Sequence, residues 1–435
     1  MRFLSSDLLF TLEPGIAPPI PKGTLVVDQK GKILEVLPYR LDRDDLEIFT
    51  GGLCPGFINA HVHLELSHLK GQIPENTGLV DFILNIQQKR GADPEIIKNS
   101  IRKALMEMKE EGIMGFGDIS NSDDSFEFKA GTSSEAGSFS SNRKDLNFKD
   151  PNRQKLSDQD FYPQNHYHQE LNPLSNELEW GNFRHHTFIE CFGFVNEKAE
   201  EIFSKASLLK QKAKNLGISV STSPHAPYSV SKNLFEIIKK NEEGLQSIHN
   251  QESEAENLFF ESGKGDFKRL YKTLGLNLAF FSPPEKRSLN YYFSLLGDQK
   301  KLLVHNSYSN QEDIKIGKAE NTFWCLCPGA NLFIEGKIPN LELFKEVFNK
   351  IVVGTDSLAS NYQLSILSEL KHLKKFYPEI SLNQTLNWAC RNGAQFFSWK
   401  ELGSLEVGKI PGILNITELD KNFELTQESR VKRII

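Results

Sequence analysis

The sequence predicts an α/β protein built as a (β/α)₈ barrel of the TIM type, with a small β-sandwich module formed from both chain ends. From residue 52 onward, apolar strand-like runs alternate with amphipathic helical stretches, which is typical of a parallel α/β architecture. The two ends carry short β-rich pieces instead. No Gly-rich nucleotide-binding turn follows the first strand of the alternating region, which favours a closed barrel over an open dinucleotide-binding sheet.

The alternating region provides enough elements for eight strands. We expect strands at 54–61, 113–119, 186–192, 217–222, 245–249, 301–305, 322–327 and 350–355. Helical periodicity predicts helices that include 94–111, 196–215, 231–241, 254–262, 340–349 and 383–397. Eight strands with intervening helices over this length of chain are typical of a (β/α)₈ barrel.

Both chain ends are expected to form the β-module. Residues 1–52 contain β-rich pieces at 23–28 and 32–36 around the turn sequence Gln-Lys-Gly, and residues 400–435 contain a further piece at 413–416. We expect these pieces to pair in one module and the barrel to occupy 53–399.

One stretch within the barrel region, 122–182, breaks the alternation. It is rich in Ser, Asn, Asp, Gln and Lys and has almost no apolar period, so it is expected to be a long insertion with high mobility. The pair His166 and His168 lies inside it, with no strand to support it. We therefore expect no metal role for that pair.

Composition excludes several functional classes. A net charge of −6 and a pI near 6.1 give no basic patch for nucleic acid, so the expected partner is a small-molecule substrate. The N-terminus has no sustained apolar run, so we expect no membrane segment. We expect the protein to be cytoplasmic. Five scattered cysteines suit a reducing compartment better than a disulfide framework. The sequence leaves open whether the chain forms a homodimer.

The strongest chemical signal is PGFINAHVH at 55–63, an apolar strand that runs into His61-x-His63. Side chains alternate along a strand, so both imidazoles point to the same face. At the carboxyl end of a barrel strand, that face looks into the mouth where active sites lie. The alternative for this motif alone is a pair of exposed loop histidines.

Four further polar side chains each follow an apolar strand. They are His225 in SPHAPYS, His249 in SIHNQE, His305 in LLVHN and Asp356 in VVGTDS. Functional residues of barrels collect at these strand ends. Each one alone has the alternative of a helix cap or a hydrogen-bonded core residue. Because five strand ends carry such groups, a shared site is favoured.

Three imidazoles and one carboxylate form a suitable ligand set for a divalent metal, with Zn²⁺ expected and Fe²⁺ as the alternative. No lysine stands at the end of the 186–192 strand, so a lysine-bridged pair of metals is not expected and the site should hold one. Hydrolysis with metal-activated water also needs a base, and Glu252 lies three residues beyond His249. Its alternative role is a charge at a helix N-terminus.

The chain resembles the amidohydrolase superfamily and, within it, the branch of metal-dependent deaminases and chlorohydrolases. The resemblance is carried by HVHLELS at 61–67, DISN at 118–121, SPHAPYS at 223–229, ESEAE at 252–256 and GTDSLASN at 354–361. It covers nearly the whole chain except 122–182.

This resemblance implies roles for individual residues. His61, His63, His249 and Asp356 would bind the metal, and Glu252 would move protons. His305 would polarise the attacking water or the developing tetrahedral centre. As a ligand, Asp356 could also accept a hydrogen bond from the attacking species. His225 would contact the substrate. Glu65 would contact it too, since we expect it on the same strand face as the two histidines. An equally favoured alternative is that Glu65 forms a salt bridge or caps a loop.

The implied reaction is hydrolytic deamination of an aminopurine carbon with release of ammonia. Within the branch, the motifs are closest to those of enzymes that deaminate aminodeoxyfutalosine in the futalosine route to menaquinone. S-adenosylhomocysteine or methylthioadenosine deamination, guanine deamination and triazine dechlorination are the alternatives. A more distant alternative is a barrel that has no catalytic activity and acts as a binding or scaffold protein.

One departure from the family pattern falls near the seventh strand. Where relatives often have Cys-Pro-Arg-Ser-Asn, this chain has Cys-Pro-Gly-Ala-Asn at 327–331 and so lacks a cation and a hydroxyl. The metal ligands are unaffected, but at Gly329 and Ala330 the resemblance gives less support to the substrate assignment.

Overall fold

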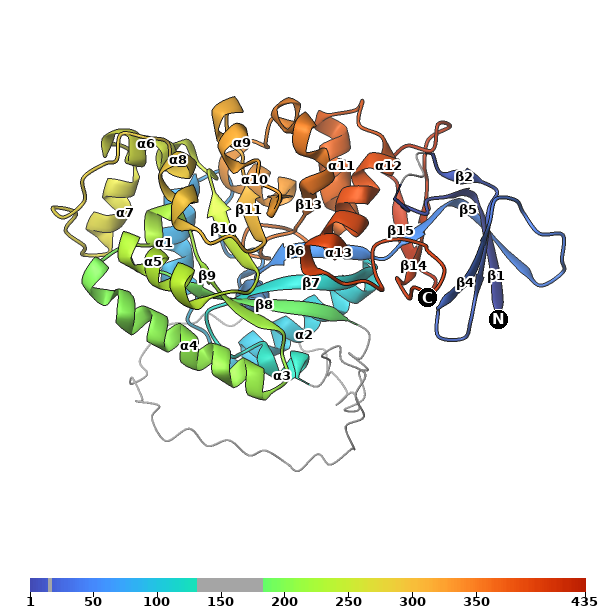
Figure 1. Ribbon diagram of the computed structural model, residues 1–435, viewed down its shortest axis with the longest axis horizontal. Helices are drawn as coiled ribbons and strands as arrows, with labels where there is room; N and C mark the ends of the chain where they lie inside the picture. The colour runs from blue at the N-terminus through green and yellow to red at the C-terminus, as the bar shows by residue number, and fades with distance from the viewer. Residues whose placement is uncertain (15–17, 131–182) are drawn as a thin grey trace, which may run out of the picture.

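The computed structural model describes residues 1–14, 18–130 and 183–435. The sequence expectations for most of the polar insertion, including those for His166 and His168, lie outside these residues. The barrel and the β-module occupy opposite ends of the long axis in Figure 1.

Eight parallel strands form the barrel, in two four-stranded sheets with the strand orders β6-β7-β8-β9 and β10-β11-β12-β13. All the pairs within these sheets are parallel. The strands are β6 (Phe57–Val62), β7 (Ile113–Ser120), β8 (Arg184–Cys191), β9 (Val220–Pro224), β10 (Gln246–Asn250), β11 (Lys301–His305), β12 (Thr322–Leu326) and β13 (Ile351–Val353). Almost every residue in them is buried, because the strands are covered on both faces as in other parallel sheets.

Backbone hydrogen bonds cross both seams between the two sheets. At one seam the amides of Thr355 and Asp356 both donate to the carbonyl of His61, and Val62 forms a parallel bridge with Asp356. At the other, the amide of His249 donates to the carbonyl of His225. These bonds lie at the carboxyl ends of the strands, so they bring the predicted site residues to one end of the barrel. The predicted α/β barrel class is confirmed.

Helices follow the strands and cover the barrel from outside (Figure 1). The local sequence explains where several helices begin. Asp93 caps α2, and Pro94 occupies its first position. Ser253 caps α6, and Asn310 forms a capping box at the start of α9. The helices are α1 (Leu79–Lys89), α2 (Pro94–Glu110), α3 (Phe126–Lys129), α4 (Ala199–Asn215), α5 (Lys232–Asn241), α6 (Glu254–Ser262), α7 (Phe267–Thr273), α8 (Ser288–Tyr292), α9 (Gln311–Gly317), α10 (Pro328–Glu335), α11 (Ile366–Phe376), α12 (Leu382–Leu386) and α13 (Asn392–Phe397).

Shorter helical turns complete the described chain. The 3₁₀ segments are η1 (Leu64–Leu69), η2 (Asn196–Lys198), η3 (Pro227–Ser229), η4 (Phe293–Leu295) and η5 (Leu341–Lys350), and a π-helical turn, η6 (Asn387–Arg391), joins α12 to α13. The predicted helix at 340–349 is thus a 3₁₀ segment, and the predicted helix at 383–397 contains a π turn.

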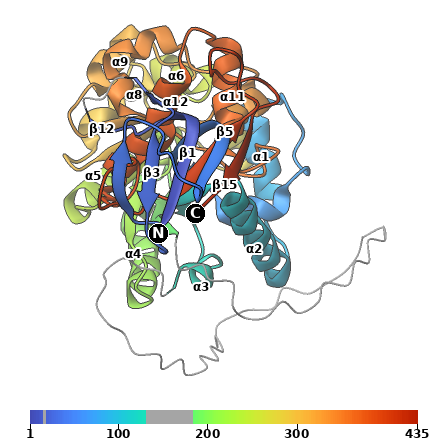
Figure 2. The same ribbon diagram turned by 90° about the vertical axis from the view of Figure 1, so that its right-hand side faces the viewer.

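The β-module contains strands from both chain ends, as expected. Its strands are β1 (Arg2–Leu9), β2 (Ile20–Pro21), β3 (Thr24–Val27), β4 (Ile33–Leu37), β5 (Leu46–Pro55), β14 (Ile413–Thr417) and β15 (Arg430–Arg433). They form one hydrogen-bonded sheet in the order β15-β14-β5-β1-β3-β4, with β2 paired to β1, rather than two separate sheets. The two termini therefore meet in this module (Figure 2).

A single residue connects the β-module to the barrel on the N-terminal side. The predicted first barrel strand at 54–61 joins the end of β5 to most of β6, and the two are separated only by Gly56. A Cβ at Gly56 would lie 2.1 Å from Cγ of Met114 and 2.7 Å from the carbonyl of Pro411. Glycine is therefore required where the chain turns into the barrel.

Among the described helices, none has both the length and the apolar character needed to cross a membrane.

Candidate metal centre and active site

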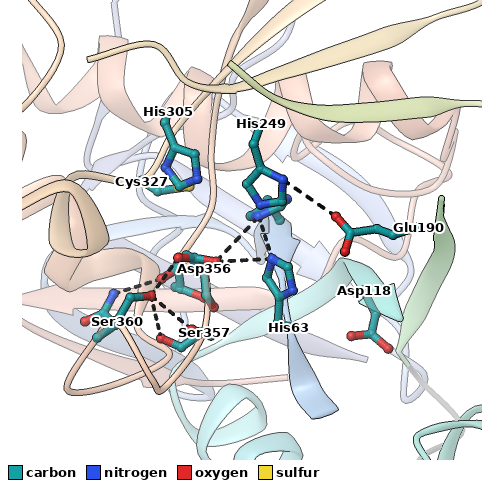
Figure 3. A network of polar contacts seen from close by, with 12 residues as sticks. His63, Asp118, Glu190, His249, His305, Cys327, Asp356, Ser357 and Ser360 are labelled. Atoms are coloured by element: carbon teal, nitrogen blue, oxygen red, sulfur yellow. Dashed lines mark hydrogen bonds and ion pairs between the residues drawn. The ribbon is translucent and has the colours of Figure 1, made fainter. Parts of the chain in front are cut away.

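The two histidines of the His-x-His motif lie side by side at the end of β6. His61 is the fifth residue of β6, and His63 is the residue immediately before the 3₁₀ segment η1. Their Nε2 atoms are 3.1 Å apart, and Oδ1 of Asp356 lies 3.6 Å from Nε2 of His61 and 3.3 Å from Nε2 of His63. Figure 3 shows His63 and Asp356 pointing toward one another, with His249 beside them.

These separations fit a bound divalent metal. In a tetrahedral site with ligands about 2.1 Å from the metal, neighbouring ligand atoms are about 3.4 Å apart. His249 completes the group, and one ligand atom from each of the four residues lies within 4.8 Å of the others. The structure therefore brings together His61, His63, His249 and Asp356, the four residues expected to bind the metal.

The charge states of these side chains also suit a metal. Burial lowers the pKa of His61 and lowers that of His249 well below its ordinary value, with further lowering of the latter by the surrounding histidines. Burial acts to raise the pKa of Asp356, but the polar contact with His61 and the neighbouring histidines outweigh it and hold the pKa well below its ordinary value. Neutral imidazoles and a carboxylate are the forms that bind metal.

Ser360 holds the carboxylate of Asp356 through the oxygen that does not face the histidines. Its hydroxyl donates to Oδ2 of Asp356 at 2.6 Å, which leaves Oδ1 facing the histidines. Asp356 itself has a left-handed backbone conformation, with φ of 57°. A non-glycine residue in that region costs about 1 to 3 kcal/mol, and such strain gathers at functional sites.

His305 and Glu252 stand beside the four potential ligands. The ring of His305 stacks on that of His249, with centroids 5.3 Å apart, and Nε2 of His305 lies 3.6 Å from Oε2 of Glu252. The amide nitrogen of Asn331 is 3.1 Å from Nδ1 of His305, so the amide donates and the ring proton is on Nε2. Within the described residues, Nε2 of His305 has no hydrogen-bond partner.

Burial is the main cause of the pKa shifts of His305 and Glu252. It lowers the pKa of His305 to about 3, so the ring is neutral. It also raises the pKa of Glu252 well above its ordinary value, with Asp356 raising it further. A carboxyl group that holds its proton more readily than usual suits proton transfer near neutral pH.

A cavity of about 360 Å³ opens onto these residues. His63, His249, Glu252, His305 and Asp356 all line it. Much of the remaining wall is apolar, with side chains from α1, α7 and the segment after β8: Leu79, Phe82, Ile83, Ile86, Phe192, Phe194, Leu270, Tyr271, Leu274 and Leu276. A mostly apolar pocket with a few convergent polar groups is typical of a small-molecule site.

His225 also lines the cavity, next to His249. Their ring centroids are 4.8 Å apart, and Nδ1 of His225 is 2.6 Å from the hydroxyl of Ser229. This contact leaves Nε2 of His225 for another partner.

Glu65 lines the cavity from a different position than expected. The prediction that it shares the strand face of the two histidines is wrong, because β6 ends at Val62 and Glu65 lies in η1. The amide of Leu64 donates to Oδ1 of Asp118 at 3.1 Å, which turns the chain away from the strand direction. The carboxylate of Glu65 accepts from the backbone and side chain of both Asn121 and Ser122.

Sequence reasoning missed Glu190, which lies near the end of β8. Its Oε1 is 3.6 Å from Nδ1 of His249 (Figure 3), and its Oε2 accepts from the side chain of Asn121 at 3.0 Å. With His225 and His249 it forms a second cluster of potential ligands. The signal was available, since Glu190 follows the apolar run of a predicted strand in the same way as the other site residues.

The departure from the family pattern at 327–331 is not in the cavity wall. Gly329 and Ala330 are buried in the first turn of α10, and neither is among the described residues that line the cavity. The amide of Gly329 donates to Oε2 of Glu369, and the side chain of Asn361 donates to Oε1 of the same carboxylate. The two positions at which this chain departs from the family pattern therefore lie outside the described cavity wall.

Comparison with known proteins gives one family. Residues 53–435 match the amidohydrolase family. An adenosine deaminase of Helicobacter pylori is 28% identical over 82% of this chain and 76% of its own length. An aminodeoxyfutalosine deaminase of Nitratiruptor is 30% identical over 37% of this chain and 39% of its own length.

Among solved structures, the aminofutalosine deaminase of Helicobacter pylori in complex with methylthio-coformycin superposes with a TM-score of 0.69. The match covers the whole of both chains at 22% identity, so it supports the fold. The family match spans the barrel and the strand ends that carry the four potential metal ligands. The chain therefore belongs to the amidohydrolase family and is a hydrolase that acts on carbon–nitrogen bonds.

Proposed function

We propose that this protein is a metal-dependent deaminase of aminopurine nucleoside-like substrates, with aminodeoxyfutalosine as the leading substrate. One observation carries the proposal: four potential metal ligands, Glu252 and His305 converge at the end of a single largely apolar cavity. The similarity to relatives named adenosine deaminase and aminodeoxyfutalosine deaminase supports the choice of substrate class.

His61, His63, His249 and Asp356 would hold one divalent metal, for which Zn²⁺ is our first choice and Fe²⁺ the alternative. The metal supplies Lewis acidity to the reaction when it is bound. Nδ1 of His249 donates to the carbonyl of His225 at 2.9 Å, so Nε2 carries the lone pair for the metal. The protonated Nδ1 is then not free to bind a second cation beside Glu190, which supports a centre with one metal.

The proposed chemistry is replacement of an amino group by water. Glu252 takes a proton from the attacking water as its oxygen bonds to the amino-bearing ring carbon, and the π electrons of the ring C=N bond move onto the ring nitrogen. Nε2–H of His305 donates a hydrogen bond to the attacking oxygen, and Oδ1 of Asp356 can accept one from it. Glu252 then returns the proton to the amino nitrogen, the exocyclic carbon–nitrogen bond breaks as the ring C=N bond re-forms, ammonia leaves, and the hydroxyl product tautomerises to the ring lactam.

The remaining polar groups of the wall would place the substrate. Nε2 of His225 can contact a ring nitrogen or hydroxyl beside the metal centre, since its Nδ1 is held by Ser229. Glu65 would act mainly by fixing Asn121 and Ser122, because its carboxylate already accepts four hydrogen bonds from them.

A substrate panel tests this proposal. Purified protein supplied with Zn²⁺ or Fe²⁺ is assayed for ammonia release from aminodeoxyfutalosine, adenosine, methylthioadenosine, S-adenosylhomocysteine and guanine, and for chloride release from a chlorotriazine. We expect ammonia from the adenine nucleosides, with the highest kcat/KM for aminodeoxyfutalosine. Reaction with guanine or the chlorotriazine alone would contradict the assignment, and so would inactivity with every compound.

A further inference from the structure

The chain leaves β11 through two successive residues in the left-handed backbone conformation. His305, the last residue of β11, has φ of 76°, and Asn306 has φ of 64°. This conformation is unfavourable for a residue with a Cβ, so it persists where the surrounding structure holds it. The direction of the His305 ring therefore depends on the contacts that fix this turn.

The side chain of Asn306 makes three hydrogen bonds at the carboxyl ends of the strands. Its Nδ2 donates to the carbonyl of Leu303 in β11 at 2.9 Å and to that of Cys325 in β12 at 3.1 Å. Its Oδ1 accepts from Nδ2 of Asn250 in β10 at 2.9 Å, and its backbone amide donates to the carbonyl of the same residue. Asn306 is 1% exposed and thus links three neighbouring strands within the barrel.

Asn250 extends this link to the loop that carries Glu252. Asn250 is the last residue of β10, two residues before Glu252, and its Oδ1 accepts from the hydroxyl of Tyr292 at 2.7 Å. The bonds between Asn250 and Asn306 therefore join the strand end of Glu252 to that of His305. Neither asparagine is among the described residues that line the cavity, so the pair does not contact the substrate.

Asparagine meets both requirements of position 306. One carboxamide supplies the two donors and the acceptor that the three strands need. Asparagine is also one of the few residues besides glycine that adopt the left-handed conformation readily. Aspartate would present a carboxylate to two carbonyl oxygens, and glycine would keep the turn but lose every side-chain bond.

We propose that Asn306 is a positioning residue that holds the ring of His305 in its working place beside Glu252. The inference rests on the proposed function, in which these two groups act on the same water. Nε2 of His305 and Oε2 of Glu252 are 3.6 Å apart, and the bonds of Asn306 tie together the strand ends that carry them. Without this tie both groups would be present but misplaced, and a shift of about 1 Å can cost about 100-fold in rate.

Asn306→Gly tests this role, because glycine accepts the left-handed backbone and removes only the side-chain bonds. The matched control is Asn392→Ala. Nδ2 of Asn392 also donates to two backbone carbonyls, those of Phe348 and Ile351. Ile351 begins β13, so these bonds lie at the opposite end of the barrel from the cavity. For each protein, kcat and KM are measured with the substrate of the panel that has the highest kcat/KM, together with metal content and unfolding in urea.

We expect Asn306→Gly to lower kcat by about 10- to 100-fold, with KM changed less than about threefold and metal content as in wild type. Asn392→Ala should unfold at lower urea concentration than wild type and keep its kcat. If Asn306→Gly does not fold, Asn250→Ala breaks the same link from the other side and should show the same division between kcat and KM. Unchanged kcat would overturn the role of Asn306, and so would a fall in metal content that accounts for the loss.

A second background separates positioning from general disruption. In His305→Gln, the change Asn306→Gly should cost less than about threefold in kcat, because the ring that Asn306 positions is already absent. An equal loss in the two backgrounds would overturn the role of Asn306 while leaving deamination intact. Absence of ammonia from every substrate of the panel with wild type would instead overturn the proposed function.

Discussion

Nε2 of His305 lies 3.6 Å from Oε2 of Glu252, with the stacked ring of His249 beside it. The two groups come from different strand ends, and both face the cavity. An attacking water placed between them can lose a proton to the carboxylate while it accepts a hydrogen bond from the ring. Two predictions concern this pair.

Glu252→Gln should retain the metal and lose about 100- to 10,000-fold in kcat, because the water loses its base while the four ligands stay in place. Turnover and metal content are measured on the same preparation. Glu254→Gln is the control, since Glu254 is an exposed carboxylate at the start of α6 and should be neutral. Normal turnover in Glu252→Gln would exclude this residue as the proton carrier.

Asn331→Leu should lower kcat by about 10- to 100-fold, because Nδ1 of His305 loses the donor that sets its tautomer. Metal content and KM should change little, since Asn331 touches neither the ligands nor the cavity. Asn340→Leu, which removes an amide at the start of η5, is the comparison. A fall in metal content together with kcat would point to general disruption of the site.

Gly329→Ala should destabilise the fold by about 1 to 3 kcal/mol, as overpacking does. A Cβ there would lie 2.6 Å from Oε1 of Glu369 and 2.7 Å from Nδ2 of Asn361, and both atoms are held by hydrogen bonds. Gly91→Ala, where a Cβ meets nothing within 4 Å, serves as the control. The free energy of unfolding is measured in urea. Equal values for the two variants would contradict the prediction and show that Glu369 and Asn361 move to accommodate the added methyl group.

Glu256→Gln should make stability less dependent on pH. Burial raises the pKa of Glu256 from 4.5 to about 7, although Ser288 and the amide of Gln251 donate to it. Between these two values the folded state keeps a proton that the unfolded chain has lost. Unfolding then releases a proton, so stability is full below pH 4.5 and is lost as pH rises toward 7.

Urea unfolding at pH 5 and pH 8 measures this effect. The wild type should lose about 1 to 3 kcal/mol more than Glu256→Gln across that interval. Parallel loss in both proteins would mean that Glu256 is ionised in the folded state.

Much of the site could be predicted from the sequence because a barrel brings strand ends together. His61, Asp356 and His305 each follow an apolar run, and the rule that active sites lie at the carboxyl ends of strands was enough to group them. The parallel strands and the β-module of both termini followed from the change in hydrophobic period.

The errors have local physical causes. Glu65 was misplaced because strand alternation was extended past Val62, where a hydrogen bond to Asp118 turns the chain. The environment of Gly329 depends on Glu369, forty residues further along, and no sequence pattern reports such a contact. Glu190 was missed because only lysine was sought at that strand end.

The most direct test of the account is activity with and without metal in a single preparation. The protein is stripped with a chelator, assayed for ammonia release from adenosine-type nucleosides, and assayed again after addition of one equivalent of Zn²⁺ or Fe²⁺, alongside His63→Ala. Activity should disappear on stripping and return with one equivalent in wild type, while His63→Ala should bind metal weakly and stay inactive. Undiminished ammonia release from the stripped protein would contradict a metal centre at His61, His63, His249 and Asp356.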